Sequence, residues 1–376
     1  MLDYCRRRSW PRHPTLPRTF LAILYLWFLL IYIPGWALGT ELGPPPTFPK
    51  DLSGLELPAE ERGLFAPQVL QVNPQNRQES RTFFNTYYLA TTPPINWTGD
   101  RATCNAGNTA ANFSDAVLLR VNYYRAMAGV PGVVFSDTYS AKDQQAALMM
   151  SVNRSLNHTP DNSWTCYTTD GAEAAGKSNL AMGTPMVGPA FIDLYFKDRG
   201  DGNYATGHRR WVLYPQTQNM GTGDLPPGGS FWAANALWIM DANIWGPRPP
   251  TREEYVAWPP PGYVPYQVVY PRWSFAIAGA NFYKAAVTMK LKSTGAAVPV
   301  VQEPLATGFG ENTLVWRANG LSSDAVWPKP AADTAYEVTV TYVVISGSPR
   351  NFTYLVTVFD PATSVGVMPA LFLLMD

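Results

Sequence analysis

Apolar residues recur every three to four positions just after residue 114. Val117, Val121 and Ala128 follow this spacing, and the sequence Gly-Val-Pro-Gly comes directly after them. Such spacing places side chains on one face of an α-helix, and glycine with proline ends the helix. We therefore predict a helix over residues 115–128, with the Ser114 hydroxyl capping its first turn.

Two further helices and two strands follow from the same kind of pattern. Asp137 can cap a second helix over 137–156, and a third, shorter helix is expected over 189–197. The apolar runs 211–213 and 236–240 are short enough to be strands. Helices and strands mixed in this way favour an α-β-α layered domain.

The pattern changes to a period of two after Trp273. Val338, Val340 and Tyr342 alternate with threonines, as expected for a strand with one buried face. The predicted strands are 282–291, 298–302, 313–316, 336–345 and 352–359. Short strands separated by turn residues favour an immunoglobulin-like β-sandwich, so the fold class is α+β, an α-β-α sandwich followed by an all-β sandwich.

The N-terminus has the pattern of an export signal. Several arginines precede an apolar run over 20–33, and Ala37-Leu38-Gly39 fits a cleavage site with small residues. The run is shorter than the roughly 20 residues of a membrane span. We predict a cleaved signal peptide and secretion to the extracellular space or periplasm, with an uncleaved anchor as the alternative.

These patterns divide the chain into six segments. We assign 1–39 to the signal peptide, 40–110 to a Pro-rich linker and N-terminal extension, 111–247 to the layered domain, 248–271 to a Pro- and aromatic-rich connector, 272–362 to the sandwich and 363–376 to an apolar tail. Within the extension, the aromatic-rich stretch 81–90 could pack on the layered domain.

Charge and cysteine content narrow the class of protein. The net charge is zero and only 15% of residues are charged, so no basic surface indicates nucleic-acid binding. Cys5 lies in the predicted signal, which leaves Cys104 and Cys166 as an even pair. In an oxidising compartment such a pair is expected to form a disulfide, and two buried free thiols are the alternative.

Only two histidines remain beyond the predicted signal, His158 and His208. Two imidazoles and one carboxylate can hold a divalent metal such as Zn²⁺, or they can act as general acid and base. Their separation in the sequence matches no local zinc motif, and each ring could simply satisfy a hydrogen bond within its own loop.

Several ordered motifs over residues 114–223 resemble those of the CAP superfamily, the cysteine-rich secretory proteins and their relatives. The resemblance covers about a third of the chain. It rests on Leu119–Ala126 (LRVNYYRA), Lys177–Ala181 (KSNLA), Gly207–Trp211 (GHRRW) and Met220–Gly223 (MGTG).

The resemblance implies a cavity with two histidines and two glutamates. His158 and His208 match the histidine positions, Ser178 stands at one glutamate position, and Asp198 is the best match to the other. Glu173 is nearby in sequence but matches no family position. We therefore predict a ligand site at His158, Ser178, Asp198 and His208, with His158 and His208 as candidate zinc ligands and His158, His208 and Asp198 as candidate catalytic residues.

The expected function is that of an extracellular binding module for a ligand or cell-surface component. No nucleic acid is expected as a partner, and the membrane only through an uncleaved signal. One alternative is a metal-assisted peptidase that uses the same cavity. The other is a structural spacer, with binding carried by the β-sandwich.

Overall fold

A computed structural model describes residues 39–49, 55–56 and 70–363. The predicted signal peptide up to Leu38 and the apolar tail from Ser364 lie outside these ranges. None of the helices in the described ranges has the length and apolar character that a membrane crossing needs.

A five-stranded sheet forms the centre of the first domain. Its strand order is β1-β3-β5-β4-β2. The strands are β1 (Gly39–Leu42), β2 (Val134–Phe135), β3 (Ser178–Thr184), β4 (Asn219–Leu225) and β5 (Ala233–Trp238). All pairs are antiparallel except β2 with β4. The edge strand β1 comes from the segment that the sequence assigns to a linker.

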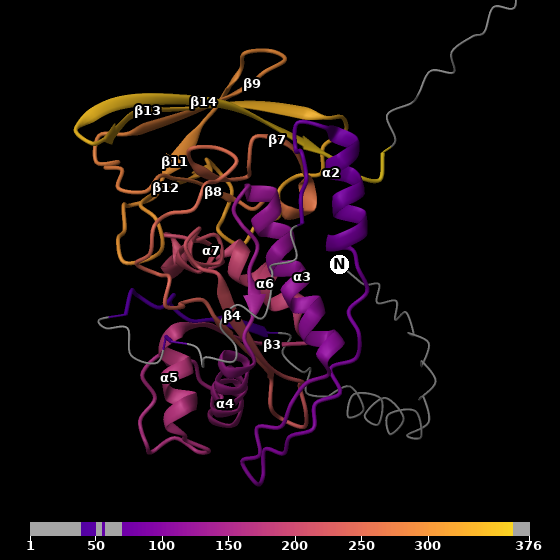
Figure 1. Cartoon of the computed structure of the whole chain (residues 1–376). Helices are drawn as coiled ribbons and strands as arrows, with labels where there is room; N and C mark the ends of the chain where they lie inside the picture. Colours follow the sequence, from indigo (N-terminus) through magenta and orange to yellow (C-terminus); the bar gives the residue numbers. More distant parts are fainter. Residues whose placement is uncertain (1–38, 50–54, 57–69, 364–376) are drawn as a thin grey trace, which may run out of the picture. The chain divides into compact units, whose positions relative to one another are not determined.

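Helices cover both faces of this sheet (Figure 1). On one face, α4 (Asp137–Asn153) packs against glycines of β4 and against α5 (Thr169–Lys177). On the other face, α6 (Pro189–Lys197) contacts α3 (Ala111–Ala128) and the short α7 (Gly207–Val212). The predicted α-β-α layering is confirmed.

The predicted helices form, with corrections at their ends. The first begins at Ala111, so Ser114 lies inside the helix and does not cap it. Ser136, and not Asp137, caps α4, which ends at Asn153. The prediction of a strand over 211–213 is wrong, because Trp211 and Val212 belong to α7. A short buried apolar run has no periodicity that separates a strand from a helix.

The C-terminal domain consists of two sheets, in the orders β10-β9-β13-β14-β7 and β11-β12-β8-β6. Seven of the strands lie beyond residue 271: β8 (Arg272–Ala276), β9 (Ala286–Leu291), β10 (Ala297–Val298), β11 (Val300–Gln302), β12 (Thr313–Ala318), β13 (Thr334–Ile345) and β14 (Ser348–Phe359). The predicted all-β domain is confirmed.

The segment assigned to a connector, 248–271, contributes to this sandwich and needs correction. β6 (Val256–Trp258) pairs with β8, and β7 (Gly262–Pro265) pairs with β14. Trp258 is fully buried. Prolines flank both strands, and prolines are rare within strands, so the sequence pattern does not predict strands here.

The predicted alternation over β13 breaks at one residue. Val338 and Val340 are fully buried, but Tyr342 is exposed and Val343 is buried in its place. The register of β13 against β14 shifts between Val340 and Val343. A bulge adds one residue to one strand, so the buried positions move by one.

Part of the N-terminal extension is ordered against the layered domain, as expected for residues 81–90. It forms α2 (Arg77–Phe83) and a π-helix over Phe84–Tyr88. The Phe83 ring stacks on the Tyr123 ring of α3 at a centroid distance of 5.2 Å, and Phe84 is fully buried. This part of the 40–110 segment is therefore packed structure and not a linker.

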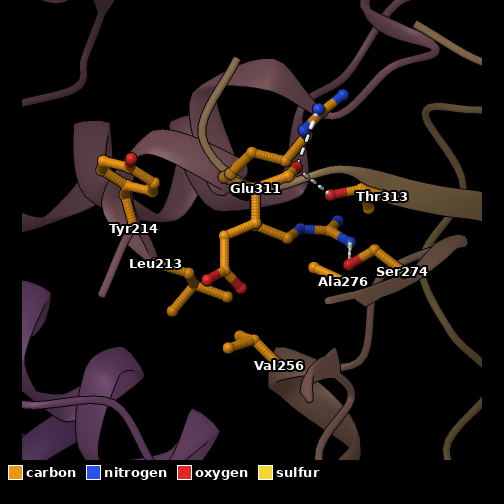
Figure 2. Close-up of a pocket in the computed structure, with 9 residues that line it drawn as sticks. Leu213, Tyr214, Val256, Ser274, Ala276, Glu311 and Thr313 are labelled. Carbon is orange, nitrogen blue, oxygen red and sulfur yellow. Dashed lines mark hydrogen bonds between the residues drawn. The ribbon is translucent and has the colours of Figure 1, made fainter. Parts of the chain in front are cut away.

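The two domains share a polar seam formed by arginines that follow His208. Arg209 donates from Nη1 to the carbonyl of Arg272 (2.7 Å), and Arg210 donates from Nη2 to the carbonyl of Glu311 (2.9 Å). Figure 2 shows the pocket at this seam, where Glu311 and Thr313 of the sandwich face Leu213 and Tyr214. Its volume is about 20 Å³, room for a single water molecule. The seam is therefore a packed junction and not a ligand site.

Candidate functional site

His208 and Asp198 form a fully buried pair on the α6 side of the sheet. The Nδ1 atom of His208 lies 2.8 Å from Oδ1 of Asp198, and the backbone N–H of Arg209 donates to Oδ2 (3.2 Å). A carboxylate accepts hydrogen bonds, so it fixes the proton on Nδ1. The Nε2 atom is buried, and no atom of the described residues bonds to it. This nitrogen is therefore a bare acceptor.

The residues around this pair hold it in place. Asp198 ends α6 with a left-handed backbone (φ 54°), and Arg272 of the sandwich donates to its carbonyl (2.8 Å). The ring of Tyr195 lies parallel to that of His208 at a centroid distance of 5.7 Å. The imidazole therefore has one orientation, which a binding site requires.

His158 follows α4, and backbone carbonyls contact both its ring nitrogens. Nδ1 lies 2.6 Å from the carbonyl oxygen of Ala175, and Nε2 lies 2.7 Å from that of Pro44. A neutral imidazole donates only one N–H, whereas an imidazolium donates two. Burial lowers the pKa of His158. The hydrogen bonds to the two carbonyls raise this pKa, but the effect of burial is larger. A positive charge on His208 would act in the same direction, because like charges disfavour each other.

Ser178 and Glu173 lie away from this pair. The Ser178 hydroxyl donates to Oδ1 of Asp143 on α4 (2.6 Å). Its neighbour Asn179 points to the opposite face of the sheet and donates to the carbonyl of His208 (3.2 Å). Glu173 pairs with Lys142 and Lys177. The predicted grouping of Ser178 with His208 therefore needs correction, because successive strand residues face opposite sides.

A three-ligand metal centre does not fit this arrangement. No group of three or more histidine, cysteine, aspartate or glutamate side chains converges within the described ranges. Asp198 orients His208, and Nε2 of His158 already contacts the Pro44 carbonyl. A zinc ion needs three or four protein ligands with free lone pairs. The side chains available here are at most the two imidazoles.

Sequence reasoning missed two buried carboxyl groups, Asp143 and Asp224. Asp143 accepts from Ser178 and from the backbone of Trp238, while Asp224 accepts from Thr222 (2.7 Å) and from a side-chain amide on β5. Burial raises the pKa of both groups, to about 6 for Asp224. No periodicity or motif marks these positions in the sequence, since acidic residues are rarely buried.

Asp224→Asn is expected to remove a loss of stability that the unmodified chain shows as pH rises from 4 to 7. The pKa of Asp224 is raised on folding, so its carboxyl group contributes stability below about pH 4 and loses it as pH rises through about 6. A shift of about two units corresponds to about 3 kcal/mol. Urea unfolding should show the variant gaining about that much relative to the unmodified chain between pH 4 and pH 7. Parallel stability curves would contradict the assignment.

The predicted disulfide is present. Cys104 and Cys166 are joined with an S–S distance of 2.04 Å and close a loop with a sequence separation of 62. It ties the segment before α3 to the loop between α4 and α5.

The fold and site define the class of protein: an α-β-α domain with a buried histidine–aspartate pair, followed by a β-sandwich. Residues 118–232 match the family model described as the cysteine-rich secretory protein family, CAP. The chain therefore contains a CAP domain, and the predicted resemblance to the CAP superfamily is confirmed over these residues. The match covers under a third of the chain.

Comparisons with curated proteins and with solved structures do not indicate a function for this chain. No curated protein matches the chain. Among solved structures, PcoC, a methionine-rich copper resistance protein from Escherichia coli, is 15% identical over 27% of this chain and 92% of its own, with a TM-score of 0.21. CopC from Methylosinus trichosporium OB3b is 17% identical over 29% and 94%, with the same TM-score. These scores are too low to bear on fold or function.

Proposed function

We propose that this protein is exported and acts as an extracellular binding module through the part of the CAP domain that holds His158 and the buried His208. The observation that carries the proposal is the buried Nε2 of His208, a bare acceptor whose ring Asp198 holds in place. A buried polar atom without a partner costs free energy, so its retention favours a role with a ligand. The Cys104–Cys166 disulfide and the CAP domain both support export.

Binding is better supported than hydrolysis. A histidine with an aspartate is the base of a nucleophilic triad, but the base must contact a hydroxyl or thiol. In the described ranges Nε2 of His208 contacts neither. Ser178 donates to Asp143 on the far face of the sheet and cannot serve as that nucleophile. Zinc binding stays a prediction, and the arrangement of ligands does not favour it.

The β-sandwich offers the competing surface of the spacer hypothesis. Tyr283 is 82% exposed and Tyr342 is 47% exposed. Tyrosine is enriched at protein interfaces relative to the rest of the protein surface. These tyrosines therefore supply the matched control for the histidines.

The test uses the full chain against three probes: a peptide array, a glycan array and phosphatidylcholine vesicles. His158→Gln with His208→Gln is expected to weaken binding to one probe class at least tenfold, because both ring contacts are lost. Tyr283→Ala with Tyr342→Ala should leave that binding unchanged. Mass spectrometry of the bound peptides should show no cleavage.

Two results would overturn the proposal. Binding that depends on the tyrosines and ignores the histidines would assign recognition to the sandwich. Cleavage that disappears in the histidine variant would instead identify a hydrolase. Equal urea unfolding midpoints for all variants exclude misfolding as the cause of any loss.

A further inference from the structure

Residues 39–48, which we call the cover segment, lie across both histidine-bearing parts of the CAP domain. In Figure 1 this is the indigo chain that passes between α5 and α7. It begins as β1, the edge strand of the central sheet, which pairs antiparallel with β3. The carbonyl of Pro44 then contacts Nε2 of His158 at 2.7 Å. The segment therefore continues the sheet and then reaches the first histidine.

The second half of the cover segment lies on the start of α7, beside His208. A Cβ atom on Gly207 would lie 2.3 Å from the Pro45 ring, so only glycine leaves room for this proline. The indole Nε1 of Trp211 donates to the carbonyl of Pro46 at 2.6 Å. The ring of Phe48 packs between Trp211 (4.7 Å) and Trp245 (4.5 Å, stacked).

These contacts are those of a protein that recognises an extended peptide. Strand addition uses main-chain hydrogen bonds, and prolines dock on aromatic rings with their carbonyls free to accept from tryptophan. His158 and Trp211 each meet a proline carbonyl, Gly207 accommodates a proline ring, and Trp245 stacks on an aromatic ring. The surface therefore fits an extended backbone that carries prolines and one aromatic side chain.

We propose that the surface under the cover segment is a binding site for an extended, proline-containing peptide ending in an aromatic residue, and that residues 39–48 occupy it as a tethered stand-in. The inference rests on the proposed function and names its ligand class. A tethered segment competes at an effective concentration in the millimolar range. A peptide in solution binds tightly only when the cover segment is displaced.

The test compares three forms of the full chain with one probe, a fluorescent peptide of the sequence GTELGPPPTF. An open variant, Pro45→Gly with Phe48→Ala, loses the contacts of the cover segment with Gly207 and Trp245. A locked variant, Glu41→Cys with Met182→Cys, can join β1 to β3, because these residues are register partners and line one hollow. Pro93→Gly with Pro94→Gly is a control for proline content outside the segment.

Fluorescence polarisation is expected to show at least tenfold tighter binding by the open variant than by the unmodified chain or the proline control. The oxidised locked variant should not bind, and reduction should return it to the affinity of the unmodified chain reduced in the same way, since reduction also opens the Cys104–Cys166 disulfide. A scrambled peptide should bind none of them. If the open variant does not fold, the change in the locked variant on reduction decides the question alone.

Equal binding by the open variant and the unmodified chain, or equal binding by the oxidised and reduced locked variant, would overturn the inference. Histidine-dependent binding to glycans or vesicles without peptide binding would overturn it too, and would leave the proposed function standing. Loss of histidine dependence with every probe would overturn both.

Discussion

Asp198→Ala is expected to lower the free energy of unfolding by about 3–5 kcal/mol. The change leaves the Nδ1–H of His208 and the backbone N–H of Arg209 without an acceptor in a site with no exposure to solvent. Each buried donor left without an acceptor costs about 1–3 kcal/mol, so the two donors together account for about this much. Urea unfolding at neutral pH measures the loss. Binding near His158 and His208 should weaken with it, because nothing then fixes the proton of His208 on Nδ1.

Two matched variants separate the contribution of the Asp198 carboxylate to stability from that of its backbone conformation. Asp198 has a left-handed φ of 54°, which costs alanine about 1 kcal/mol and glycine almost nothing. Asp198→Gly should therefore retain most of the loss, whereas Asp198→Asn, whose amide oxygen can still accept one hydrogen bond, should lose less than half of it. A loss below 1 kcal/mol in Asp198→Gly would contradict the role of the carboxylate.

Cys104→Ser with Cys166→Ser is expected to destabilise the protein by about 4 kcal/mol. With a sequence separation of 62, the disulfide removes loop-closure entropy from the unfolded chain. The measurement is the urea unfolding free energy of the oxidised chain and the variant. The reduced unmodified chain is the control, and it should match the variant.

A difference below 1 kcal/mol between the oxidised chain and the cysteine variant would show that the loop is already constrained when unfolded. A reduced chain much less stable than the variant would instead indicate that the free thiols disturb the fold.

The sequence predicts elements whose signals are local. The helix over 189–197 has the predicted ends, because a proline occupies its first turn and a turn-rich stretch begins at Asp198, directly after Lys197. The α7 helix was predicted in part as a strand, since Trp211 and Val212 are held by packing and not by periodicity. Strands within the proline-rich stretch 248–271 were missed for a similar reason: their pairing partners lie far along the chain.

The candidate site, too, could be predicted only where its signals are local in the sequence. The motif with His208 and the position of Asp198 lead to a pair that the structure brings into contact. The orientation of Ser178 depends on which face of β3 it occupies, and the partner Asp143 comes from α4. The three prolines over 44–46 predict a linker when the sequence is considered alone. Their contacts are with His158 and Trp211, more than a hundred residues away, and no local pattern indicates such distant partners.

The most direct test of the central claim follows the ring signals of His158 and His208 by nuclear magnetic resonance. The GTELGPPPTF peptide is added to the open variant of the full chain. Both imidazoles should shift as the peptide binds, because Pro44 contacts the His158 ring and Pro45 packs on Gly207, directly before His208. Movement of only one ring, or of sandwich signals alone, would contradict the account.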